Sequence, residues 1–540
     1  MVDAVVGAET TSGAKTAHRP RLEAQPNIGV ILLFLALLAT GVLFAAYSLH
    51  RDVVNSGMPV TTWLPFLLLG VALLIALGFE FVNGFHDTAN AVATVIYTHS
   101  LPANVAVVWS GFFNFLGVLL SSGAVAFGII SLLPVELILQ VGTSAGFAMV
   151  FALLIAAIIW NLGTWWLGLP ASSSHTLIGS IIGVGVANAL MRGMDGTSGV
   201  DWSKATEIGY SLLLSPVFGF CMAALLLLVL KFLVRKPELY SEPKGSTPPP
   251  WWIRGILILT CTGVSFAHGS NDGQKGMGLI MLILIGTVPM AYALNRTPAP
   301  NQVAEFKANS AAAAAVIESK GAGHSIYGNP RPAVSAFISA RKINEGTYPS
   351  LAALVREISK QVEAHGSIAQ LPGDVVANTR NDMYLASEAV RFVLKDKENE
   401  LSKEEAGKLV AYKKSLDEAT RFIPLWVKVA VAIALGLGTM VGWKRIVITV
   451  GEKIGKSHLT YAQGAAAEVV AAGTIGAADV LGLPVSTTHV LSSGVAGTMA
   501  ANRSGLQLAT VRNLLLAWVL TLPMAIMLSG LLYYLFAQIF

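Results

Sequence analysis

"FVNGFHDTANAVAT" occupies residues 81–94, and its polar side chains directly follow an apolar run, residues 63–77, that suits a lipid environment. A second stretch, "FAHGSNDGQKGMG", begins at Phe266 and repeats the Phe, Gly and Asp of the first in the same register. The repeated residues are Phe81, Gly84 and Asp87 in the first stretch and Phe266, Gly269 and Asp272 in the second. An ionised carboxylate at membrane depth is costly unless it is paired or binds a cation. The two stretches therefore predict a buried polar site to which the chain contributes twice.

The composition indicates a protein that lies mostly in lipid. Of its 540 residues, 54% are hydrophobic and only 12% are charged, whereas soluble domains average about 25% charged residues. Several apolar windows approach the roughly 20 residues that a helix needs to cross a bilayer, and they predict an all-α polytopic membrane protein. The formal charge of +5 does not indicate nucleic-acid binding, and the two cysteines fall in apolar segments without a disulfide framework.

A second pair of motifs indicates that the chain contains two related halves. "LGLPASSSHTLIGS", residues 167–180, matches "LGLPVSTTHVLSSG", residues 481–494, with the same Leu-Gly-Leu-Pro start and the same histidine. The two copies of this motif lie farther apart in the chain than the two copies of the first motif, so the second half contains an insertion. Residues 296–421 are rich in alanine, lysine and glutamate with helical patterning. They predict a soluble, mostly helical loop domain.

These features divide the chain into five parts. We expect an N-terminal tail with an extra anchor helix (residues 1–50), repeat A (63–234), a basic cytoplasmic linker (235–250), repeat B (251–295 and 422–540) and the inserted loop domain (296–421). Lysine and arginine gather in the linker and in the second half, and such clusters mark cytoplasmic loops. Repeat A would then enter the membrane from outside and repeat B from inside. The charge pattern therefore predicts two inverted-topology repeats, with the inserted domain outside the cytoplasm.

Opposite orientation of the repeats requires an odd number of membrane crossings in each. The hydrophobic segments supply one crossing too many unless some of them are broken. We therefore expect residues 63–97 to form one helix interrupted near Gly84, with an equivalent break at Gly269. Residues 147–190 are expected to form a re-entrant hairpin folded at "LPASSSH". Inverted repeats with interrupted helices are typical of secondary transporters that bind their substrate near the bilayer midplane.

Free helix ends and hydroxyl groups favour an anion as the ligand. A helix N-terminus presents unpaired N–H groups and a positive dipole, and the expected breaks provide four of them, after Gly84, Gly269, Pro170 and Pro484. The further candidate substrate-binding residues are Ser172, Ser173, Ser174, Ser486, Thr487, Thr488, Asn83, Gln274 and Lys275. Hydroxyl and amide groups of this kind suit a tetrahedral oxyanion bound without a dedicated arginine. The alternative is that the hydroxyl residues after each proline are ordinary helix caps.

The two carboxylates predict a coupling site. Asp87 and Asp272 are related by the repeat and are candidates to hold a cation or a proton together. Histidine titrates near neutral pH, so His86 and His268, which lie within the repeated motifs, are candidate proton carriers, and Asn90 is a further polar candidate. No two histidines have the spacing of a metal site on one helix. We therefore predict no metal site, and no cofactor other than a coupling proton.

Several short motifs carry a family resemblance. They are "GFHD" at 84–87 with "GSND" at 269–272, "PASSSH" at 170–175 with "PVSTTH" at 484–489, "WNLGTW" at 160–165 and "YAQG" at 461–464. In these motifs the chain resembles the inorganic phosphate transporter (PiT) family, above all its bacterial low-affinity proton-coupled members. The likeness covers residues 63–297 and 422–540. It implies a multi-pass symporter of the bacterial inner membrane, often a homodimer, that moves phosphate into the cytoplasm, and we expect it to work by alternating access.

The family's functional positions can be carried over residue by residue. The resemblance implies anion contacts at Ser172, Ser173, Ser486, Thr487 and the amides near Gly84 and Gly269, and cation coupling at Asp87, Asp272, Asn90 and Asn271. The sequence departs from the family pattern at His86 and Lys275, where asparagine would be expected. Both changes weaken a sodium site made of neutral oxygen ligands, so we expect proton coupling. In relatives of this kind, phosphate is thought to be carried as a neutral complex with a divalent metal.

Other functions stay open at this point. A sodium-coupled phosphate symporter and a sulfate permease of the same fold are the alternatives, since sulfate shares the tetrahedral shape of phosphate. An intramembrane hydrolase that uses Ser174 and His175 is disfavoured, because adjacent residues on a helix point about 100° apart. We therefore expect that the chain is not an enzyme. The charges buried at both motifs also argue against an anion channel.

Overall fold

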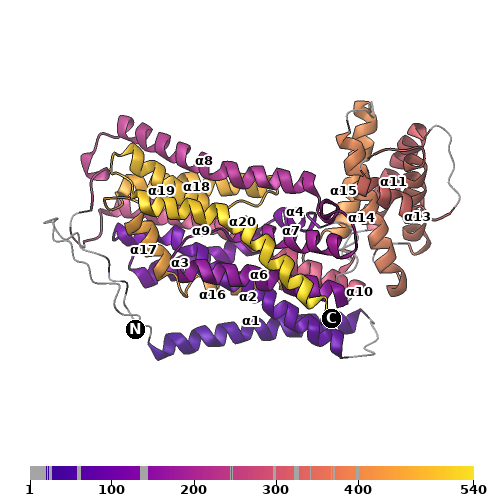
Figure 1. Ribbon diagram of the computed structural model, residues 1–540, viewed down its shortest axis with the longest axis horizontal. Helices are drawn as coiled ribbons and strands as arrows, with labels where there is room; N and C mark the ends of the chain where they lie inside the picture. The colour runs from indigo at the N-terminus through magenta and orange to yellow at the C-terminus, as the bar shows by residue number, and fades with distance from the viewer. Residues whose placement is uncertain are drawn as a thin grey trace.

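The structure is a computed structural model of the 540-residue chain. It describes residues 20, 22, 27–56, 63–133, 144–243, 245, 247–295, 300–321, 328–340, 342–366, 368, 371–396 and 401–539. These residues form an elongated assembly of helices (Figure 1), and their one β-type contact is an isolated bridge between Gly455 and Leu506.

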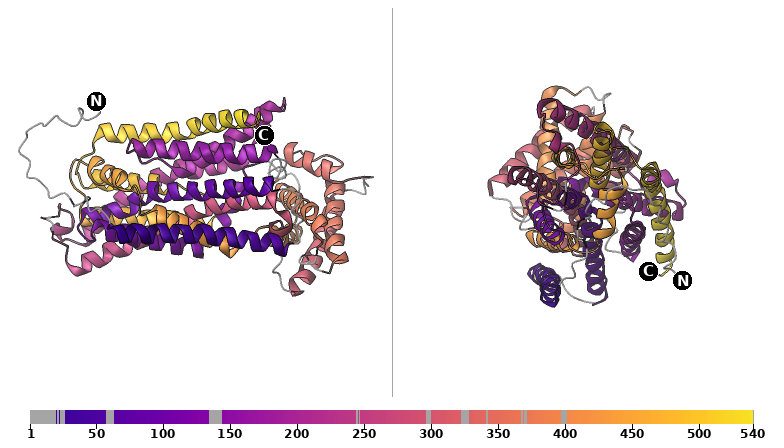
Figure 2. Two further views of the ribbon diagram at one scale, coloured as in Figure 1. Left: turned by 90° about the horizontal axis from the view of Figure 1, so that it is seen from below. Right: turned by 90° about the vertical axis from the view of Figure 1, so that its left-hand side faces the viewer.

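The helices fall into two halves and an inserted group. The first half contains α1 (Ile28–Asn55), α2 (Leu64–Tyr97), α3 (Ala103–Leu120), α4 (Ala124–Ile130), α6 (Ser144–Trp166), α7 (Ser173–Met191), η1 (Gly196–Gly199), α8 (Trp202–Leu233) and η2 (Pro237–Leu239). The second half contains α9 (Trp251–Thr287), α10 (Pro289–Tyr292), α16 (Leu425–Gly438), α17 (Lys444–Ile448), η5 (Thr449–Lys453), α18 (Tyr461–Val480), α19 (Thr487–Ala501) and α20 (Leu508–Phe536). The inserted group contains α11 (Pro300–Lys320), α12 (Arg331–Ala340), α13 (Thr347–Ala364), α14 (Gly373–Lys395) and α15 (Lys403–Thr420). Figure 2 shows the long helices of both halves running along one common axis.

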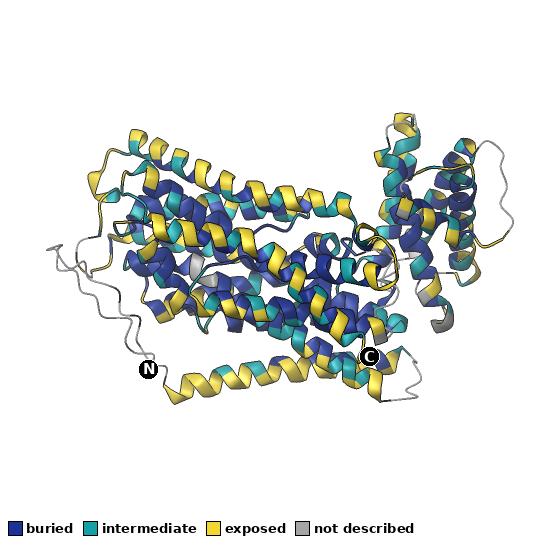
Figure 3. Ribbon diagram, viewed as in Figure 1, coloured by how far each residue is buried: buried dark blue, intermediate teal, exposed yellow. Residues whose placement is uncertain are grey.

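The long helices have the length and surface of membrane spans. The described residues contain seven helices that are long and apolar enough to cross a membrane, or eight if α15 and α16 form one bent span. The outer helices α1, α8 and α20 expose large apolar side chains such as Leu43, Phe232 and Val519, and the ribbons of these helices are largely yellow, the colour of exposed residues, in Figure 3. Exposed apolar surface on this scale is stable in lipid and unfavourable in water. The all-helical, membrane-type fold predicted from the sequence is therefore confirmed.

Helix α1 lies along the outside of the bundle and is held near its C-terminal end. The Asp52 carboxylate accepts hydrogen bonds from Tyr292 Oη at 2.9 Å and from Trp426 Nε1 at 3.0 Å. These bonds tie α1 to α10 and α16. The extra helix expected within residues 1–50 is thus present and extends to Asn55, while most of the expected tail, residues 1–19, lies outside the described residues.

Two helical hairpins lie at the centre of the bundle. Helices α6 and α7 pack on each other as hairpin A, whose connecting residues 167–172 are here called tip A. Helices α18 and α19 pack on each other as hairpin B, whose connecting residues 481–486 are here called tip B. Each tip contains a glycine with a positive φ of 67°, Gly168 in tip A and Gly482 in tip B. Glycine adopts this left-handed conformation without strain, and the proline two residues later cannot sit in a helix interior. A helical hairpin at "LPASSSH" is therefore encoded locally, and its re-entrant character stays a prediction.

The two tips point toward opposite ends of the bundle. Tip A lies beside α17, where Arg445 Nη1 donates a hydrogen bond at 2.7 Å to the carbonyl of Trp166, the residue directly before the tip. Tip B reaches α4, where Gly482 lies beside Ala124. In Figure 1, α17 lies at one end of the bundle of long helices, and α4 lies toward the other end, which faces the inserted helices. The hairpins therefore run in opposite directions and overlap in the middle of the bundle.

Helices of the two halves pack in matching pairs. Helix α2 packs on α16, and α9 packs on α3; α6 packs on α7 and α20, and α18 packs on α19 and α8. Each helix pair in this list thus has an equivalent pair in which every helix is replaced by its counterpart from the other half. Because α2 of the first half packs on α16 of the second, and α9 of the second packs on α3 of the first, the halves are interleaved and share one core.

The interruptions predicted at Gly84 and Gly269 are wrong. Helices α2 and α9 each continue through these residues without a break. The glycines allow close helix packing instead. A Cβ atom on Gly84 would lie 2.4 Å from the carbonyl oxygen of Leu435 in α16, and one on Gly269 would lie 2.2 Å from that of Asn114 in α3. Small residues let helix backbones approach closely in membranes. Four helix N-termini were expected, and the described residues contain two of them, at the starts of α7 and α19.

Helices α11–α15 form a separate bundle at one end of the molecule (Figure 1). Helix α11 packs on α13 and α15, and α14 packs on α15 and α12, around a core that includes Leu354 and Ile358. Arg391 of α14 joins this bundle to α8, because its Nη2 donates to Asp201 Oδ2 at 3.0 Å. Helix α17, which carries Lys444 and Arg445, lies at the opposite end. The inserted residues and the basic residues of α17 are therefore at opposite ends of the long axis.

Candidate functional site

Asp87 of α2 and Asp272 of α9 lie on either side of a hydroxyl group from α7. Ser173 Oγ is 2.9 Å from Asp87 Oδ2 and 3.4 Å from Asp272 Oδ2. A hydroxyl has one proton, so it donates to one of these carboxylates at a time. All three side chains are buried. The structure thus brings together the two carboxylates predicted as a coupling site, one from each half.

Hairpin B reaches the same place from the other end. Thr488 Oγ1, in the first turn of α19, donates a hydrogen bond to Asp87 Oδ1. Ser174 Oγ of α7 donates to the Val485 carbonyl of tip B at 2.7 Å. Both hairpins therefore contact each other and the Asp87 carboxylate, which makes this carboxylate the point where the halves meet.

Ser172 and Ser486 act as helix caps. Ser172 Oγ accepts a hydrogen bond from the His175 amide at 3.1 Å, and Ser486 Oγ accepts one from the His489 amide at 3.1 Å. An N-cap side chain satisfies one of the unpaired N–H groups at a helix start. For these two residues the capping alternative describes the observed contacts. The N-termini that they cap, with their positive dipole ends, lie beside the carboxylate cluster.

Lys275 supplies a fixed positive charge to this cluster. Its Nζ lies 2.6 Å from Asp272 Oδ2 and 3.3 Å from Ser173 Oγ. The lysine side chain is fully buried. A buried ammonium is costly unless it is paired, so the pair with Asp272 offsets one of the two carboxylate charges.

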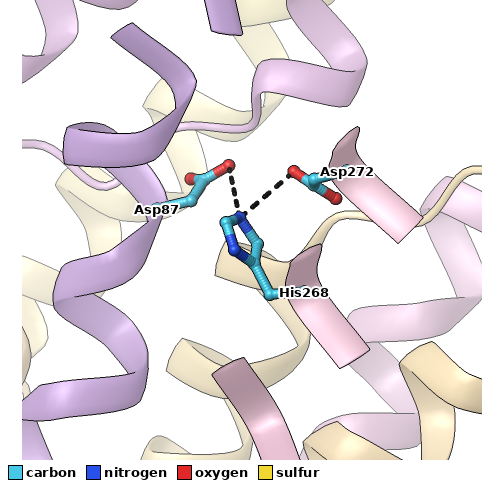
Figure 4. A group of neighbouring side chains, drawn as sticks. All are labelled: Asp87, His268 and Asp272. Atoms are coloured by element: carbon cyan, nitrogen blue, oxygen red, sulfur yellow. Dashed lines mark ion pairs between the residues drawn. The ribbon is translucent and has the colours of Figure 1, made fainter. Parts of the chain in front are cut away.

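Two histidines lie beside the same carboxylates. His268 Nε2 is 3.5 Å from Asp272 Oδ2 and 4.0 Å from Asp87 Oδ2. Figure 4 draws the two ion pairs as dashed lines. His86 Nδ1 is 3.3 Å from Asp87 Oδ1, and its Nε2 is 3.2 Å from Thr164 Oγ1. Each imidazole therefore has a carboxylate at hydrogen-bond or ion-pair range, an arrangement that suits proton exchange.

The carboxylates and His268 can also surround a cation. One ligand atom from each of Asp87, His268 and Asp272 lies within 4.8 Å of the other two. Carboxylate oxygens and imidazole nitrogens are common ligands for metal ions. His268 and Asp272 lie four residues apart on α9, but Asp87 belongs to the other motif, so helical spacing alone does not reveal the third ligand. The absence of a metal site stays a prediction.

Two of the predicted residues hold tip B and do not face the carboxylates. Gln274 Nε2 donates to Asp479 Oδ1 at 2.5 Å, and its Oε1 accepts from the Val125 amide at 2.9 Å. Asn271 Nδ2 donates to the Leu483 carbonyl of tip B at 3.2 Å. Both side chains leave α9 on a different face from Asp272, which explains why neighbours in sequence have separate partners.

The remaining predicted residues also lie outside the carboxylate cluster. Asn83 Nδ2 donates to Glu80 Oε2 at 3.5 Å. Thr487 Oγ1 is buried and has no hydrogen-bond partner among the described residues. The amides of Gly84 and Gly269 belong to continuous helices and are not the free anion donors that were expected. The side chain of Asn90 lies outside the described part of the structure.

The structure adds three carboxylates that the motifs do not indicate. They are Glu80, which accepts from Asn83, Glu468, which accepts from Thr260 Oγ1, and Asp479, which accepts from Ser270 Oγ at 2.7 Å. Glu80 and Glu468 are fully buried. An ionisable residue within an apolar segment is itself a signal of function, and that signal is present in the sequence. None of the three carboxylates recurs in the other half, so the repeat does not point to them.

Comparison with known proteins identifies the family. Residues 83–529 match the family described as "Phosphate transporter family". The chain belongs to this family. The match extends over both motif pairs and the residues inserted between them. As a member of a transporter family, the protein is not an enzyme, as the sequence predicts.

Curated relatives align with this transporter over almost their whole length. It is 43% identical to the low-affinity inorganic phosphate transporter PitA of Escherichia coli (strain K12) over 496 residues, which cover 87% of this chain and 97% of PitA. It is 42% identical to PitB of the same organism over 502 residues, 88% of this chain and 97% of PitB. A probable low-affinity inorganic phosphate transporter of Bacillus subtilis (strain 168) is 27% identical, over 88% of this chain and 99% of the relative. A solved structure titled "The sodium-dependent phosphate transporter" is 19% identical, with a TM-score of 0.48, and covers 88% of this chain and 100% of its own.

Proposed function

We propose that this protein is a secondary active symporter that imports inorganic phosphate together with protons by alternating access. One observation carries the proposal: Ser173 of hairpin A and Thr488 of hairpin B both donate to Asp87. Elements of both halves thus share one buried polar centre, as a site that faces each side of the membrane in turn requires. Relatives in Escherichia coli are named low-affinity inorganic phosphate transporters, which supports phosphate as the substrate.

The directions of the two hairpins support inverted repeats and alternating access. Tip A lies beside α17 and tip B lies beside α4, toward opposite ends of the bundle. If the basic residues of α17 lie in the cytoplasm, as the positive-inside rule implies, the inserted bundle lies outside it. We assign the protein to the bacterial inner membrane in this orientation. Movement of tip B would then open the site to the outside, and movement of tip A would open it to the cytoplasm.

Charge supplies the coupling in this proposal. Two like unit charges 4 Å apart repel each other by about 4 kcal/mol at an effective dielectric constant of 20. Lys275 offsets the charge of Asp272, but Asp87 would still repel a phosphate anion. Protonation of Asp87, with His86 and His268 as neighbours that can pass a proton, removes this repulsion. Phosphate entry and proton entry therefore favour each other.

The position of Lys275 favours protons over sodium. Its ammonium group lies 2.6 Å from Asp272 Oδ2, the oxygen that also belongs to the group able to surround a cation. A sodium ion at that place would lie close to a like charge. Sodium coupling is the second candidate, and the proximity of Asp87, His268 and Asp272 is the observation in its favour.

Phosphate suits this centre better than sulfate does. Phosphate can carry a proton near neutral pH, whereas sulfate cannot, so a proton-coupled site discriminates between two anions of the same shape. A divalent metal bound to phosphate would cancel its charge in the same way. We therefore include a neutral metal–phosphate complex as the transported form. We also propose that the transporter acts as a homodimer.

Uptake into proteoliposomes tests the proposal. Purified protein is reconstituted, pH and sodium gradients are imposed separately, and radiolabelled phosphate is measured with and without Mg²⁺. We expect an acidic exterior to drive uptake without sodium, Mg²⁺ to increase it, arsenate to compete and sulfate to have no effect. Uptake that follows the sodium gradient and ignores pH would establish the second candidate instead.

The Asp87→Asn variant should be uncoupled or inactive, because its side chain cannot be ionised and protonated in turn. We expect proton-driven uptake to fall by roughly 100-fold, the lower range for loss of a proton-transfer group. Asp195→Asn is the matched control, since Asp195 is an exposed carboxylate at the start of η1. Normal uptake by Asp87→Asn with an intact response to pH would refute the role of Asp87.

A further inference from the structure

Each hairpin is joined to a central helix at matching positions, but by different chemistry. In the first half, Phe85 of α2 packs edge-on against Trp165 of α6, with ring centroids 5.2 Å apart. In the second half, Ser270 Oγ of α9 donates to Asp479 Oδ2 of α18 at 2.7 Å. The contact of α6 with α2 next to tip A is therefore apolar, although Trp165 Nε1 also donates to the Gly442 carbonyl at 2.8 Å, and the contact of α18 with α9 next to tip B is polar.

The repeat motifs align these two contacts residue by residue. Phe85 and Ser270 each follow the aligned glycine of the first motif pair, "GFHD" and "GSND". Trp165 and Asp479 each lie two residues before the Leu-Gly-Leu-Pro that begins a tip. The two halves thus use the same pair of positions to attach a hairpin to α2 or to α9.

Asp479 is placed for its contacts with α9. Besides the bond from Ser270, its Oδ1 accepts from Gln274 Nε2 at 2.5 Å. Both donors are on α9. The carboxylate lies in the last turn of α18, where the helix dipole disfavours a negative charge. It therefore does not stabilise its own helix, and the charge-assisted bonds to α9 account for its position.

These bonds lie directly beside the segment that closes over the site. Tip B follows Asp479 after one residue, and its Val485 is buried with its carbonyl bonded to Ser174 of the other hairpin. Thr488, which contacts Asp87, comes three residues later. Asn271 of α9 also bonds tip B, at the Leu483 carbonyl, so separation of Asp479 from α9 would loosen the tip and favour exposure of the buried residues behind it.

We propose that Asp479 is a positioning residue that helps to hold tip B closed, and that Trp165 helps to hold tip A closed. This inference rests on the proposed function, because closing and opening of the tips are the two steps of alternating access. Two packed rings separate only by exposing apolar surface to water, whereas hydrogen bonds of a carboxylate can be exchanged for bonds to water. Tip B is therefore the tip that opens more readily.

Cysteine labelling tests the inference without any measurement of transport. The native Cys221 and Cys261 are replaced by alanine, and the reporters are Val485→Cys in tip B and Ala171→Cys in tip A, which are aligned by the motifs and both buried. Protein in detergent, with both ends accessible, is labelled with N-ethylmaleimide. In the parent background the tip B reporter should react faster than the tip A reporter.

The variants should act on one tip each. Asp479→Ala is expected to speed labelling of the tip B reporter about tenfold, through the loss of two hydrogen bonds, and to leave the tip A reporter unchanged. Trp165→Ala should have the opposite selectivity. Asp479→Asn, which keeps one acceptor oxygen, should fall between parent and Asp479→Ala. Equal acceleration at both reporters, or none at either, would overturn the proposal.

Phosphate uptake into right-side-out vesicles gives a second readout. Asp479→Ala should lower KM about threefold, because a larger fraction of molecules has tip B open and ready to bind, and should lower the maximal rate because closure is impaired. A variant that is merely destabilised loses maximal rate with an unchanged KM, and that result contradicts the proposal. If the parent protein takes up no phosphate at all, the proposed function fails, while the labelling pattern still decides the role of Asp479.

Discussion

Lys275 and Asp272 form an ion pair that water does not reach. Their charged groups lie 2.6 Å apart, and both side chains are fully buried. Loss of one partner leaves an uncompensated buried charge, which costs about 3–5 kcal/mol. We predict that Asp272→Asn lowers the free energy of unfolding by about this amount, and that addition of Lys275→Met recovers most of the loss. Thermal unfolding in detergent measures both changes, and an Asp272→Asn protein as stable as the parent would contradict the prediction.

Two arginines of the inserted bundle have opposite surroundings. Arg331 donates to Asp382 from Nε at 2.5 Å and from Nη2 at 2.7 Å. Arg380 is 4% exposed, lies over the Tyr384 ring at 5.2 Å, and has no ion pair among the described residues. Burial lowers the pKa of the Arg380 guanidinium from its ordinary value to about 10.

We predict that Arg380→Met stabilises the inserted bundle by about 1 kcal/mol, because it removes an unpaired buried charge. Arg331→Met should destabilise the bundle, because it leaves the buried Asp382 carboxylate without its partner. Hydrogen exchange of the α14 amides in the full-length protein measures both effects. Faster exchange in both variants would show that Arg380 has a stabilising partner.

Part of the site could be predicted residue by residue. Asp87 and Asp272 recur in two aligned motifs, and a buried carboxylate needs a partner, so their proximity follows from the sequence. The partners of Gln274 and Asn271 do not follow, because they depend on which face of α9 points toward tip B. Asp479 has no counterpart in the repeat, so its role appears only when α9 and α18 are seen side by side.

At the scale of helices, α9 contains glycines with two different roles. A Cβ atom on Gly269 would lie 2.2 Å from the Asn114 carbonyl, whereas one on Gly255 would have no neighbour within 4 Å. We predict that Gly269→Ala pushes α9 away from α3 and costs about 1–3 kcal/mol. Gly255→Ala, the matched control, should be neutral or stabilising by up to about 1 kcal/mol. Melting temperatures in detergent compare the two, and equal values would mean that the α9–α3 contact tolerates the extra methyl group.

The same glycines explain which elements could be predicted. The hairpin tips are determined by local chemistry, since a glycine in the left-handed region and a proline reverse the chain whatever packs around them. The breaks expected in α2 and α9 rest on glycine alone, which can either loosen a helix or allow a close helix crossing. The positions of α16 and α3 decide between these uses, and neither position can be read from the motif.

At the scale of the whole molecule, the inserted bundle is joined to the start of α8. Asp201 caps α8 through Oδ1, which accepts from its first amides at 3.1 Å, and accepts from Arg391 through Oδ2 at 3.0 Å. We predict that Arg391→Gln loosens the bundle and speeds limited proteolysis between α15 and α16. Arg356→Gln, which breaks an exposed pair with Glu318, should leave the cleavage rate unchanged because exposed pairs contribute little. Equal cleavage of the two variants would show that Arg391 does not hold the bundle in place.

The exchange of helix partners between the halves also has a consequence for biosynthesis. Helix α2 leaves the ribosome long before α16, and α3 leaves it long before α9. At about 5–20 residues per second, α2 waits in the bilayer for tens of seconds before α16 is made, with Gly84 and the Asp87 carboxylate without their packing partners. A nascent chain that stops before α16 should therefore be treated by the cell as unfinished and be degraded by membrane proteases.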